Sequence, residues 1–177
     1  MASQKITAGD IFPRFNLAQV GGGVLAVGQP GGDNDWQLVV VYRGKHCPIC
    51  TQYLVTLAAL KERFAEIGVD VVAISGDPQD KAAAHAGVFG ATYPVGYDLS
   101  TDRMKTLGLY ISHPRSARET DRPFAEPGLF VINGDGKVQV IDISNAPFAR
   151  PDLESLVGGL KFIRDPANQY PIRGTYS

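Results

Sequence analysis

Residues 38–42, Leu-Val-Val-Val-Tyr, form an unbroken apolar run, and residues 69–75 form a second run rich in valine. Strands of this kind are typical of a sheet with both faces covered, because neither face is left to water. Between the two runs, apolar side chains recur every three to four residues, which predicts a helix from Cys47 to about Gly68. A strand, a helix and a second strand in this order predict an α/β fold. The apolar positions of the expected helix are Leu54, Leu57, Leu60, Phe64 and Ile67.

The rest of the chain continues this alternation. The first 35 residues are rich in turn signals, and the patterns at residues 12–17 and 24–28 predict a small N-terminal β-hairpin. The whole order is β-hairpin, β, α, β, α, β, α, β, β, α, which predicts a central mixed sheet flanked by helices, in one domain over residues 1–177. The later elements expected are a helix from Pro78 to Val88 capped by Asp77, a strand at 93–97, a helix from Ser100 or Thr101 to Leu107, a loop at 113–127, paired strands at 128–133 and 137–143, and a final helix starting at Arg150-Pro151-Asp152.

Composition and charge exclude several classes of protein. Seventeen basic residues against eighteen acidic ones give a net charge of -1, so there is no electrostatic case for binding nucleic acid or an anionic membrane. The longest apolar run has five residues, whereas a membrane span needs ~20. The first ten residues lack the apolar core of a secretory signal. We therefore expect a cytoplasmic protein, although a processed precursor would look the same.

The chain has two cysteines, Cys47 and Cys50, which cannot form the disulfide framework of a secreted scaffold. Cys47 follows a predicted strand and begins a predicted helix, where α/β proteins place their sites and where free N–H groups favour an anion. Lys45, Arg43 and the neighbouring His46 would lower the pKa of Cys47 further. Cys50 lies one helical turn later, so Cys47 is expected to attack and Cys50 to resolve the product into a disulfide.

Two plainer interpretations of these cysteines are disfavoured. The first is that the two cysteines are inert, buried apolar residues. They are the only two in the chain, they have C-x-x-C spacing, and they lie on a strand-to-helix turn, which together favour a chemical role. A zinc site needs four ligands, and the remaining His46, His85 and His113 show no paired ligand spacing. The sequence therefore predicts no metal and no cofactor. The three arginines of the 113–127 loop are ordinarily solvated, and the alternative that one of them reaches the thiolate stays open.

The segment LVVVYRGKHCPIC at residues 38–50 resembles the strand, loop and C-x-x-C motif of thioredoxin-fold proteins. Those proteins place a cis-proline directly before a later strand, facing the two sulfurs. The resemblance therefore implies that Pro127, which precedes the predicted strand at 128–133, is a cis-proline of the site.

Most of the chain is similar, more specifically, to the peroxiredoxin branch, the alkyl hydroperoxide reductase and thiol-specific antioxidant family. The opening at residues 8–17 is similar to G-x-x-x-P-x-F-x-L, and residues 71–77 are similar to V-x-x-I-S-x-D. Residues 93–98 resemble F-P-L-x-x-D, residues 107–109 resemble Y-G-V, and residues 130–138 resemble the F-V-I-D and G-x-I hairpin. The order of these segments is specific even though each alone is weak.

The active loop departs from the peroxiredoxin pattern P-x-x-x-T/S-x-x-C. Gly44 stands at the hydroxyl position and Val40 at the proline position. Pro127 replaces the arginine expected before the later strand, and Cys50 stands where a glutamate is common. The resemblance is therefore to a peroxiredoxin-like subgroup with a thioredoxin-type C-x-x-C.

Three functions follow from the resemblance. In the favoured one, the Cys47 thiolate reduces a hydroperoxide, Cys50 closes a disulfide, Arg43 or Lys45 stabilises the leaving oxygen, and a thioredoxin-like or other dithiol reduces the product. In the second, Cys47 attacks a protein disulfide, which the missing hydroxyl favours. In the third, the domain is a non-enzymatic redox sensor. Many relatives are homodimers, and here Tyr110, Phe124 or the C-terminal tail are the candidate contacts.

Overall fold

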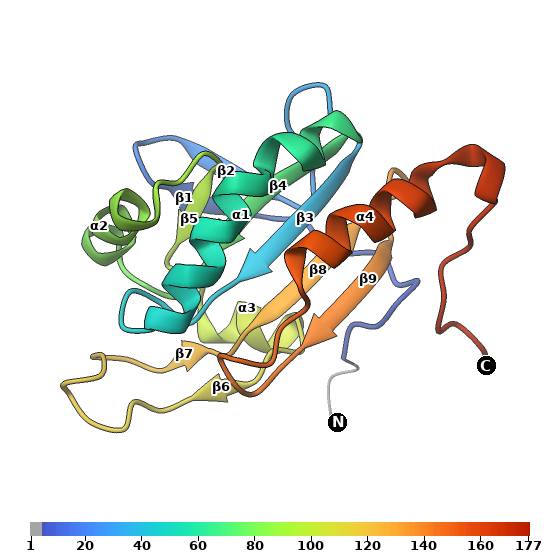
Figure 1. Ribbon diagram of the computed structural model, residues 1–177. Helices are drawn as coiled ribbons and strands as arrows, with labels where there is room; N and C mark the ends of the chain where they lie inside the picture. Colours follow the sequence, from blue (N-terminus) through green and yellow to red (C-terminus); the bar gives the residue numbers. More distant parts are fainter. Residues whose placement is uncertain (1–4) are drawn as a thin grey trace.

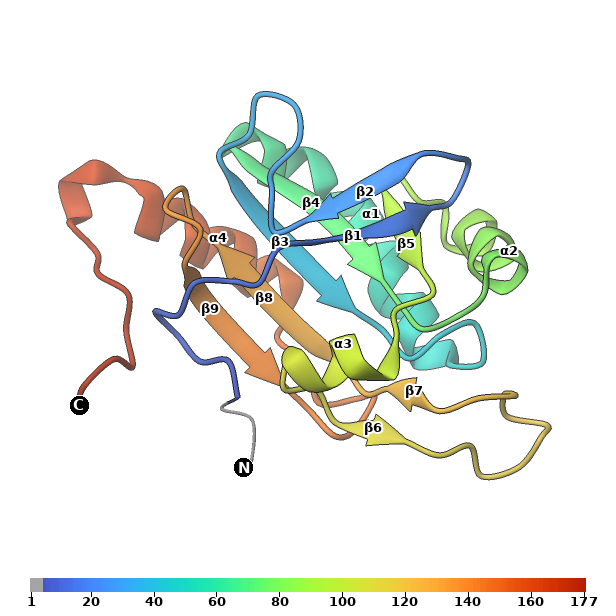
Figure 2. The same ribbon diagram turned by 180° about the vertical axis from the view of Figure 1, so that it is seen from behind.

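The computed structural model describes residues 5–177 and shows a seven-stranded mixed sheet with helices on both faces (Figures 1 and 2). The strand order β2-β1-β5-β4-β3-β8-β9 confirms the predicted thioredoxin-like α/β fold. The elements are β1 (Phe15–Gln19), β2 (Val24–Val27), β3 (Trp36–Val41), α1 (Pro48–Glu66), β4 (Val69–Ile74), α2 (Gln79–Phe89), β5 (Val95–Tyr97), α3 (Thr101–Thr106), β6 (Ile111–Ser112), β7 (Phe124–Ala125), β8 (Gly128–Ile132), β9 (Val138–Ile143) and α4 (Leu153–Arg164), followed by a short 3-10 turn, Pro166–Asn168.

Strand β3 lies inside the sheet and ends at the site. It pairs in parallel with β4 and antiparallel with β8, so both of its edges are hydrogen-bonded. Its alternate side chains enter two different cores, Val40 on one face and Val39 and Val41 on the other. This explains the unbroken apolar run, because every residue of Leu38–Tyr42 is buried.

The two faces of the sheet have separate apolar cores. Helices α1, α2 and α4 cover one face, and α3 with the N-terminal segment around Phe12 covers the other (Figures 1 and 2). The large side chains of the first core are fully or almost fully buried, and each contributes about 1.5–3 kcal/mol relative to an exposed position. They include Leu54, Leu57, Phe64, Phe89, Leu153, Val157 and Leu160.

Helix α1 has one buried face, as its periodicity predicts, and Gly68 after it adopts a positive φ of 75° that lets the chain turn into β4. None of the helices in residues 5–177 combines the length and the apolar composition that crossing a bilayer requires. The N-terminal hairpin is also confirmed, since β1 pairs with β2 and joins the sheet through β5.

Two local predictions are wrong. Helix α2 begins at Gln79 with Pro78 as its cap residue, and Asp77 does not cap it. The Asp77 carboxylate instead accepts a hydrogen bond from the backbone N–H of Lys45 at 2.8 Å, which ties β4 to the loop before Cys47. The segment predicted as a loop at 113–127 ends in β7, which forms a short two-stranded sheet with β6.

Pro127 is not a cis-proline, because the described residues contain no cis peptide bond. The chain passes from β7 into β8 through Glu126 and Pro127 alone. Each of these two residues makes one backbone hydrogen bond to a neighbouring segment. The Glu126 N–H donates to the Tyr110 carbonyl at 2.8 Å, and the Pro127 carbonyl accepts from the Ser144 N–H at 3.0 Å. This extended path between two strands is compatible with the ordinary trans bond.

Candidate active site

Cys47 is the N-cap of α1 and its sulfur closes the first turn. The Cys50 N–H donates to the Cys47 Sγ atom at 3.2 Å, the geometry in which an N-cap side chain accepts from the third helical residue. Pro48 occupies the first turn, where its missing N–H costs nothing. Both cysteines are free thiols, and both are buried. The predicted placement of C-x-x-C at a helix start is therefore confirmed.

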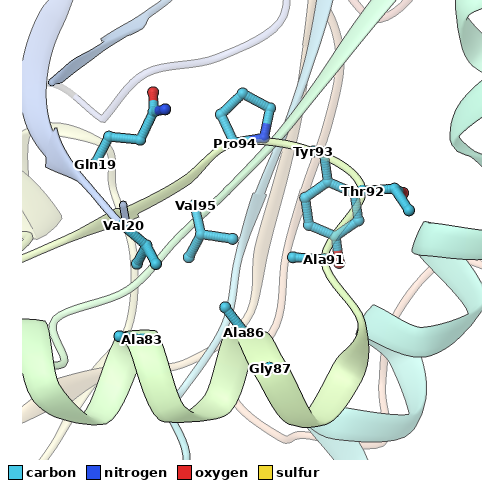
Figure 3. Close-up of a pocket in the computed structure, with 10 residues that line it drawn as sticks. All are labelled: Gln19, Val20, Ala83, Ala86, Gly87, Ala91, Thr92, Tyr93, Pro94 and Val95. Carbon is cyan, nitrogen blue, oxygen red and sulfur yellow. The ribbon is translucent and has the colours of Figure 1, made fainter. Parts of the chain in front are cut away.

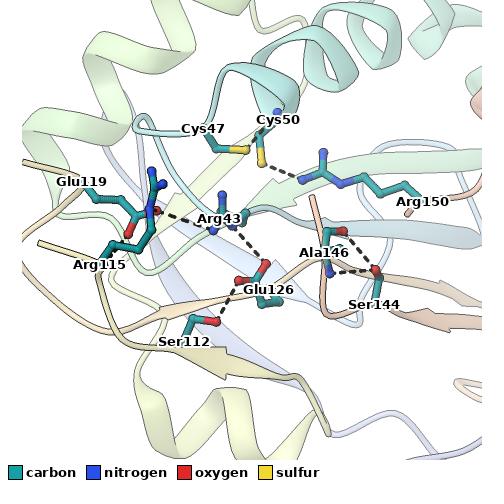
Figure 4. Close-up of polar contacts among 10 residues, drawn as sticks. All are labelled: Arg43, Cys47, Cys50, Ser112, Arg115, Glu119, Glu126, Ser144, Ala146 and Arg150. Carbon is teal, nitrogen blue, oxygen red and sulfur yellow. Dashed lines mark hydrogen bonds and ion pairs between the residues drawn. The ribbon is translucent and has the colours of Figure 1, made fainter. Parts of the chain in front are cut away.

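Arg43 is fixed beneath the cysteines by two glutamates (Figure 4). Its Nε atom lies 3.0 Å from Oε2 of Glu126, and its Nη2 atom lies 3.8 Å from Oε1 of Glu119. Glu126 is buried, and its other oxygen accepts from the Ser112 hydroxyl at 2.8 Å. The guanidinium also lies 4.8 Å from the centre of the Phe124 ring. These contacts hold one predicted site residue rigidly beside Cys47.

Arg150 is a second cation at the site, and sequence reasoning missed it. Its Nη2 atom donates to the Cys50 Sγ atom at 2.6 Å, from the segment just before α4 (Figure 4). In the sequence, this arginine is only the first residue of a helix-start signal. Its contact with Cys50 spans one hundred residues of chain and has no local pattern that could have revealed it.

These contacts make the two cysteines electrostatically unequal. The pKa of Cys47 falls well below the usual thiol range, to about 6. The largest cause is a hydrogen bond from the Cys50 side chain, while burial acts in the opposite direction. The Cys50 N–H, a hydrogen bond from the Arg43 side chain and the charge of Arg150 lower the pKa further. Burial raises the pKa of Cys50, and the neighbouring Cys47 sulfur raises it further. At neutral pH these shifts favour the thiolate on Cys47 and the protonated thiol on Cys50.

The ultraviolet absorbance of the thiolate should titrate with a midpoint near pH 6 in the reduced protein. Because the folded pKa lies below that of a free thiol, Cys47 loses its proton as the pH rises through 6, and roughly nine-tenths of it is charged at pH 7. Alkylation by iodoacetamide should follow the same curve. The Cys47→Ser variant is the control and should lack this transition; a midpoint at about pH 8 or above would contradict the assignment.

The loop between β3 and Cys47 leaves no room for the hydroxyl of the peroxiredoxin pattern. Gly44 has a φ of 141°, and a Cβ atom there would lie 2.6 Å from Oδ1 of Asp77. Since that carboxylate also holds the Lys45 N–H, a side chain at position 44 would displace the contact that shapes the loop. The Lys45 side chain itself is exposed and borders a hollow of about 350 Å³, together with His46. Its predicted role at the leaving oxygen stays a prediction.

Pro127 and the remaining candidates lie around the site rather than at the sulfurs. Pro127 is buried and borders, with Arg150, a void of only about 10 Å³. His85 is a packing residue: it is buried, hydrogen-bonded to the Thr51 hydroxyl at 2.8 Å, and burial lowers its pKa to about 4. The three loop arginines do not contact the sulfurs: Arg115 pairs with Glu119, Arg122 pairs with Asp121, and Arg118 is exposed. His113 is exposed.

A larger hollow, of about 510 Å³, lies between α2 and the strand β5, away from the cysteines (Figure 3). Its one titratable side chain is Tyr93, whose hydroxyl donates to the Leu54 carbonyl at 2.9 Å. Its lining therefore contains no thiol, imidazole or carboxylate. Within residues 5–177, no three His, Cys, Asp or Glu side chains are grouped as a metal site would require. The lining residues are Gln19, Val20, Ala83, Ala86, Gly87, Ala91, Thr92, Tyr93, Pro94 and Val95.

Comparison with known proteins agrees with this geometry. The family model described as AhpC/TSA family matches residues 8–141. No curated protein matches the chain in sequence. Among solved structures, peroxidoxin BcpB from Mycobacterium tuberculosis is similar with a TM-score of 0.74 and 24% identity, covering 90% of this chain and 99% of that one. A mutant of peroxiredoxin 6 from Arenicola marina has a TM-score of 0.74 at 21% identity, covering 92% and 75% of the two chains. AhpC from Mycobacterium tuberculosis has a TM-score of 0.72 at 14% identity, covering 92% and 96%.

Proposed function

The chain belongs to the AhpC/TSA family of thiol peroxidases, and we propose that Cys47 reduces a hydroperoxide and that Cys50 resolves the product. The observation that carries the assignment of roles is the asymmetry of the two sulfurs. Cys47 is the N-cap sulfur that accepts the Cys50 N–H, and it takes the charge of the pair. Cys50 is buried in the first turn and keeps its proton. The stronger nucleophile at neutral pH is therefore Cys47.

The first step breaks the O–O bond of the hydroperoxide. The Cys47 thiolate attacks one oxygen and becomes a sulfenic acid, while the other oxygen leaves with the electron pair and takes up a proton as an alcohol or water. The Arg43 guanidinium is the fixed cation beside this sulfur and stabilises the negative charge that develops on the leaving oxygen. Its two ion pairs with glutamates place it there before the peroxide binds.

The second step closes the disulfide. The Cys50 sulfur attacks the sulfenic sulfur of Cys47, an S–S bond forms, and the hydroxyl leaves as water with the proton of Cys50. The two residues lie in one helical turn, so this step needs little motion of the backbone. A thioredoxin-like or other external dithiol then reduces the disulfide and restores both thiols. Ile49, between the two cysteines, is 47% exposed and marks where such a reductant approaches.

Exchange with a protein disulfide is the second candidate function, and Gly44 is the observation that favours it. The position has no hydroxyl to orient a peroxide, and the Asp77 carboxylate occupies the space that one would need. In this reaction the Cys47 thiolate attacks a substrate disulfide and Cys50 releases the mixed disulfide. The same two sulfurs serve both reactions, so the substrate is what distinguishes them.

Of the contacts expected for a homodimer, Phe124 is excluded. It is 3% exposed and is covered by Arg43 and by the ring of His46, whose centre lies 4.5 Å away. Tyr110 is 49% exposed and stays a candidate contact.

Mixing the reduced protein with one equivalent of hydrogen peroxide tests the proposal. We expect the intact mass to fall by two hydrogens, at a rate far above that of free cysteine, since the thiolate and its cation are already in place. Hydrogen peroxide is the substrate of choice because it is the smallest hydroperoxide and Cys47 is only 2% exposed. A rate equal to that of free cysteine would exclude the peroxidase, and reduction of insulin disulfides would then test the exchange reaction.

A further inference from the structure

Arg150 is held against the second cysteine by two contacts with helix α1. Its Nη2 atom donates to the Cys50 Sγ atom at 2.6 Å, and its guanidinium lies 4.9 Å from the centre of the Tyr53 ring. The Tyr53 hydroxyl donates to the Pro151 carbonyl at 2.7 Å, which fixes the backbone next to the arginine. Cys50 and Tyr53 are three residues apart and share one face of α1. The helix that carries the cysteines thus also holds the cation.

No carboxylate in residues 5–177 forms an ion pair with this guanidinium. Its Nε and Nη1 atoms are buried and have no hydrogen-bond partner in the described chain. Asp142 and Asp152 border hollows that Arg150 also lines, yet neither is within ion-pair distance. Arg43 at the same site forms ion pairs with two glutamates, although its Nε atom also lacks a hydrogen-bond partner, so the two arginines differ in ion pairing alone. A guanidinium placed in this way is stabilised mainly by negative charge on the cysteine pair.

We propose that Arg150 sets the redox equilibrium of the Cys47–Cys50 pair by stabilising the reduced, singly charged dithiol over the disulfide. The inference rests on the proposed function in one respect, the formation of this disulfide. In the reduced protein, the Arg150 N–H donates to the Cys50 sulfur and the Cys50 thiol donates to the Cys47 thiolate, a chain in which each hydrogen bond strengthens the next. In the disulfide, neither sulfur is charged, so the positive charge of Arg150 no longer has a negative charge beside it.

Arg150 lies beyond residues 8–141, the part of the chain that matches the family model. It contacts Cys50 and acts on Cys47 only through it, so it is a positioning residue. The consequence is a disulfide that is easier to reduce, because the reduced form is the one that the protein stabilises.

Equilibrium with glutathione measures this effect. The S–S bond of oxidised glutathione breaks, the Cys47–Cys50 bond forms, and two electrons pass from the protein sulfurs to glutathione. Cys50 supplies one proton to the glutathione thiols and the solvent supplies the other, because Cys47 is already a thiolate. In Arg150→Met, the equilibrium constant for disulfide formation should rise tenfold or more, and each tenfold change is about 30 mV in potential. Arg150→Lys keeps the charge and should recover most of the wild-type value.

Arg164→Met is the matched control. Arg164 is also a guanidinium over an aromatic ring, 4.8 Å from the centre of Trp36, but it pairs with Asp35 and contacts no sulfur. Its loss should leave the equilibrium constant within about threefold of the wild type. A purely structural effect of Arg150 would lower the stability of both redox forms and leave their ratio unchanged.

The thiolate titration is the second measurement. It distinguishes a failure of the inference about Arg150 from a failure of the proposed resolving role of Cys50. In Arg150→Met its midpoint should rise, since the charge near the pair is lost. If Arg150→Met and Arg150→Lys both keep the wild-type equilibrium constant and titration midpoint, the inference is overturned. If the wild type forms no Cys47–Cys50 disulfide at any ratio of glutathione, the resolving role of Cys50 is overturned instead, and the titration still decides whether Arg150 stabilises the thiolate.

Discussion

Replacing Cys47 by serine should reduce the rate of hydroperoxide reduction roughly a thousandfold or more, because the nucleophile itself is removed. Replacing Cys50 by serine should have a different result. The first step should proceed at nearly the wild-type rate, since the serine hydroxyl can donate to Cys47 in place of the thiol, and Cys47 keeps the N–H of residue 50 and the Arg43 cation. The protein should then stop at the sulfenic acid of Cys47, detected by a gain of one oxygen in the intact mass and by trapping with dimedone.

The two variants are controls for one another, because each removes one sulfur and keeps the fold of the first turn. A Cys50→Ser protein that forms no sulfenic acid while Cys47→Ser still reacts with peroxide would reverse the roles of the two cysteines. Equal loss of the first step in both variants would mean that the thiolate depends on the Cys50 thiol, which donates the largest stabilising hydrogen bond to Cys47.

Replacing Arg43 by methionine should destabilise the protein by about 3–5 kcal/mol, the usual cost of removing one partner of a buried ion pair. The reason is Glu126, which is 4% exposed and would keep a buried charge without its cation. Urea denaturation of the reduced protein measures this change. The peroxide reaction should also slow about a hundredfold, since the leaving oxygen loses its fixed cation.

A second substitution separates stability from chemistry. In Arg43→Met with Glu126→Gln, the buried charge is gone, so most of the stability should return while the peroxide reaction stays slow. Recovery of the rate together with the stability would show that Arg43 acts only on the fold. Arg115→Met is the surface control: Arg115 pairs with Glu119 at 3.4 Å but is 88% exposed, and its loss should change the stability by no more than about 0.5 kcal/mol.

Position 44 illustrates how a departure from a family pattern can be read from the sequence and explained only by the structure. The missing hydroxyl was evident from the spacing to Cys47. Its physical reason is the carboxylate of Asp77, which occupies the space beside Gly44 and holds the loop through Lys45. The sequence suggested a different use for Asp77, as a helix cap, because Asp before Pro is the usual signal for one. The tertiary contact with the loop prevailed over that local preference.

The sequence by itself determined the order of the helices and of the strands in the seven-stranded sheet, and the position of Cys47 at the start of α1. These follow from periodicity and from local hydrogen bonding, which involve residues only a few positions apart. Only the tertiary structure decided which cations face the sulfurs. Arg43 is at the site because buried Glu126 holds it there, whereas Lys45, two residues later, points to solvent. Arg150 reaches Cys50 across one hundred residues because α4 packs against α1, and such long-range packing has no counterpart in a local pattern.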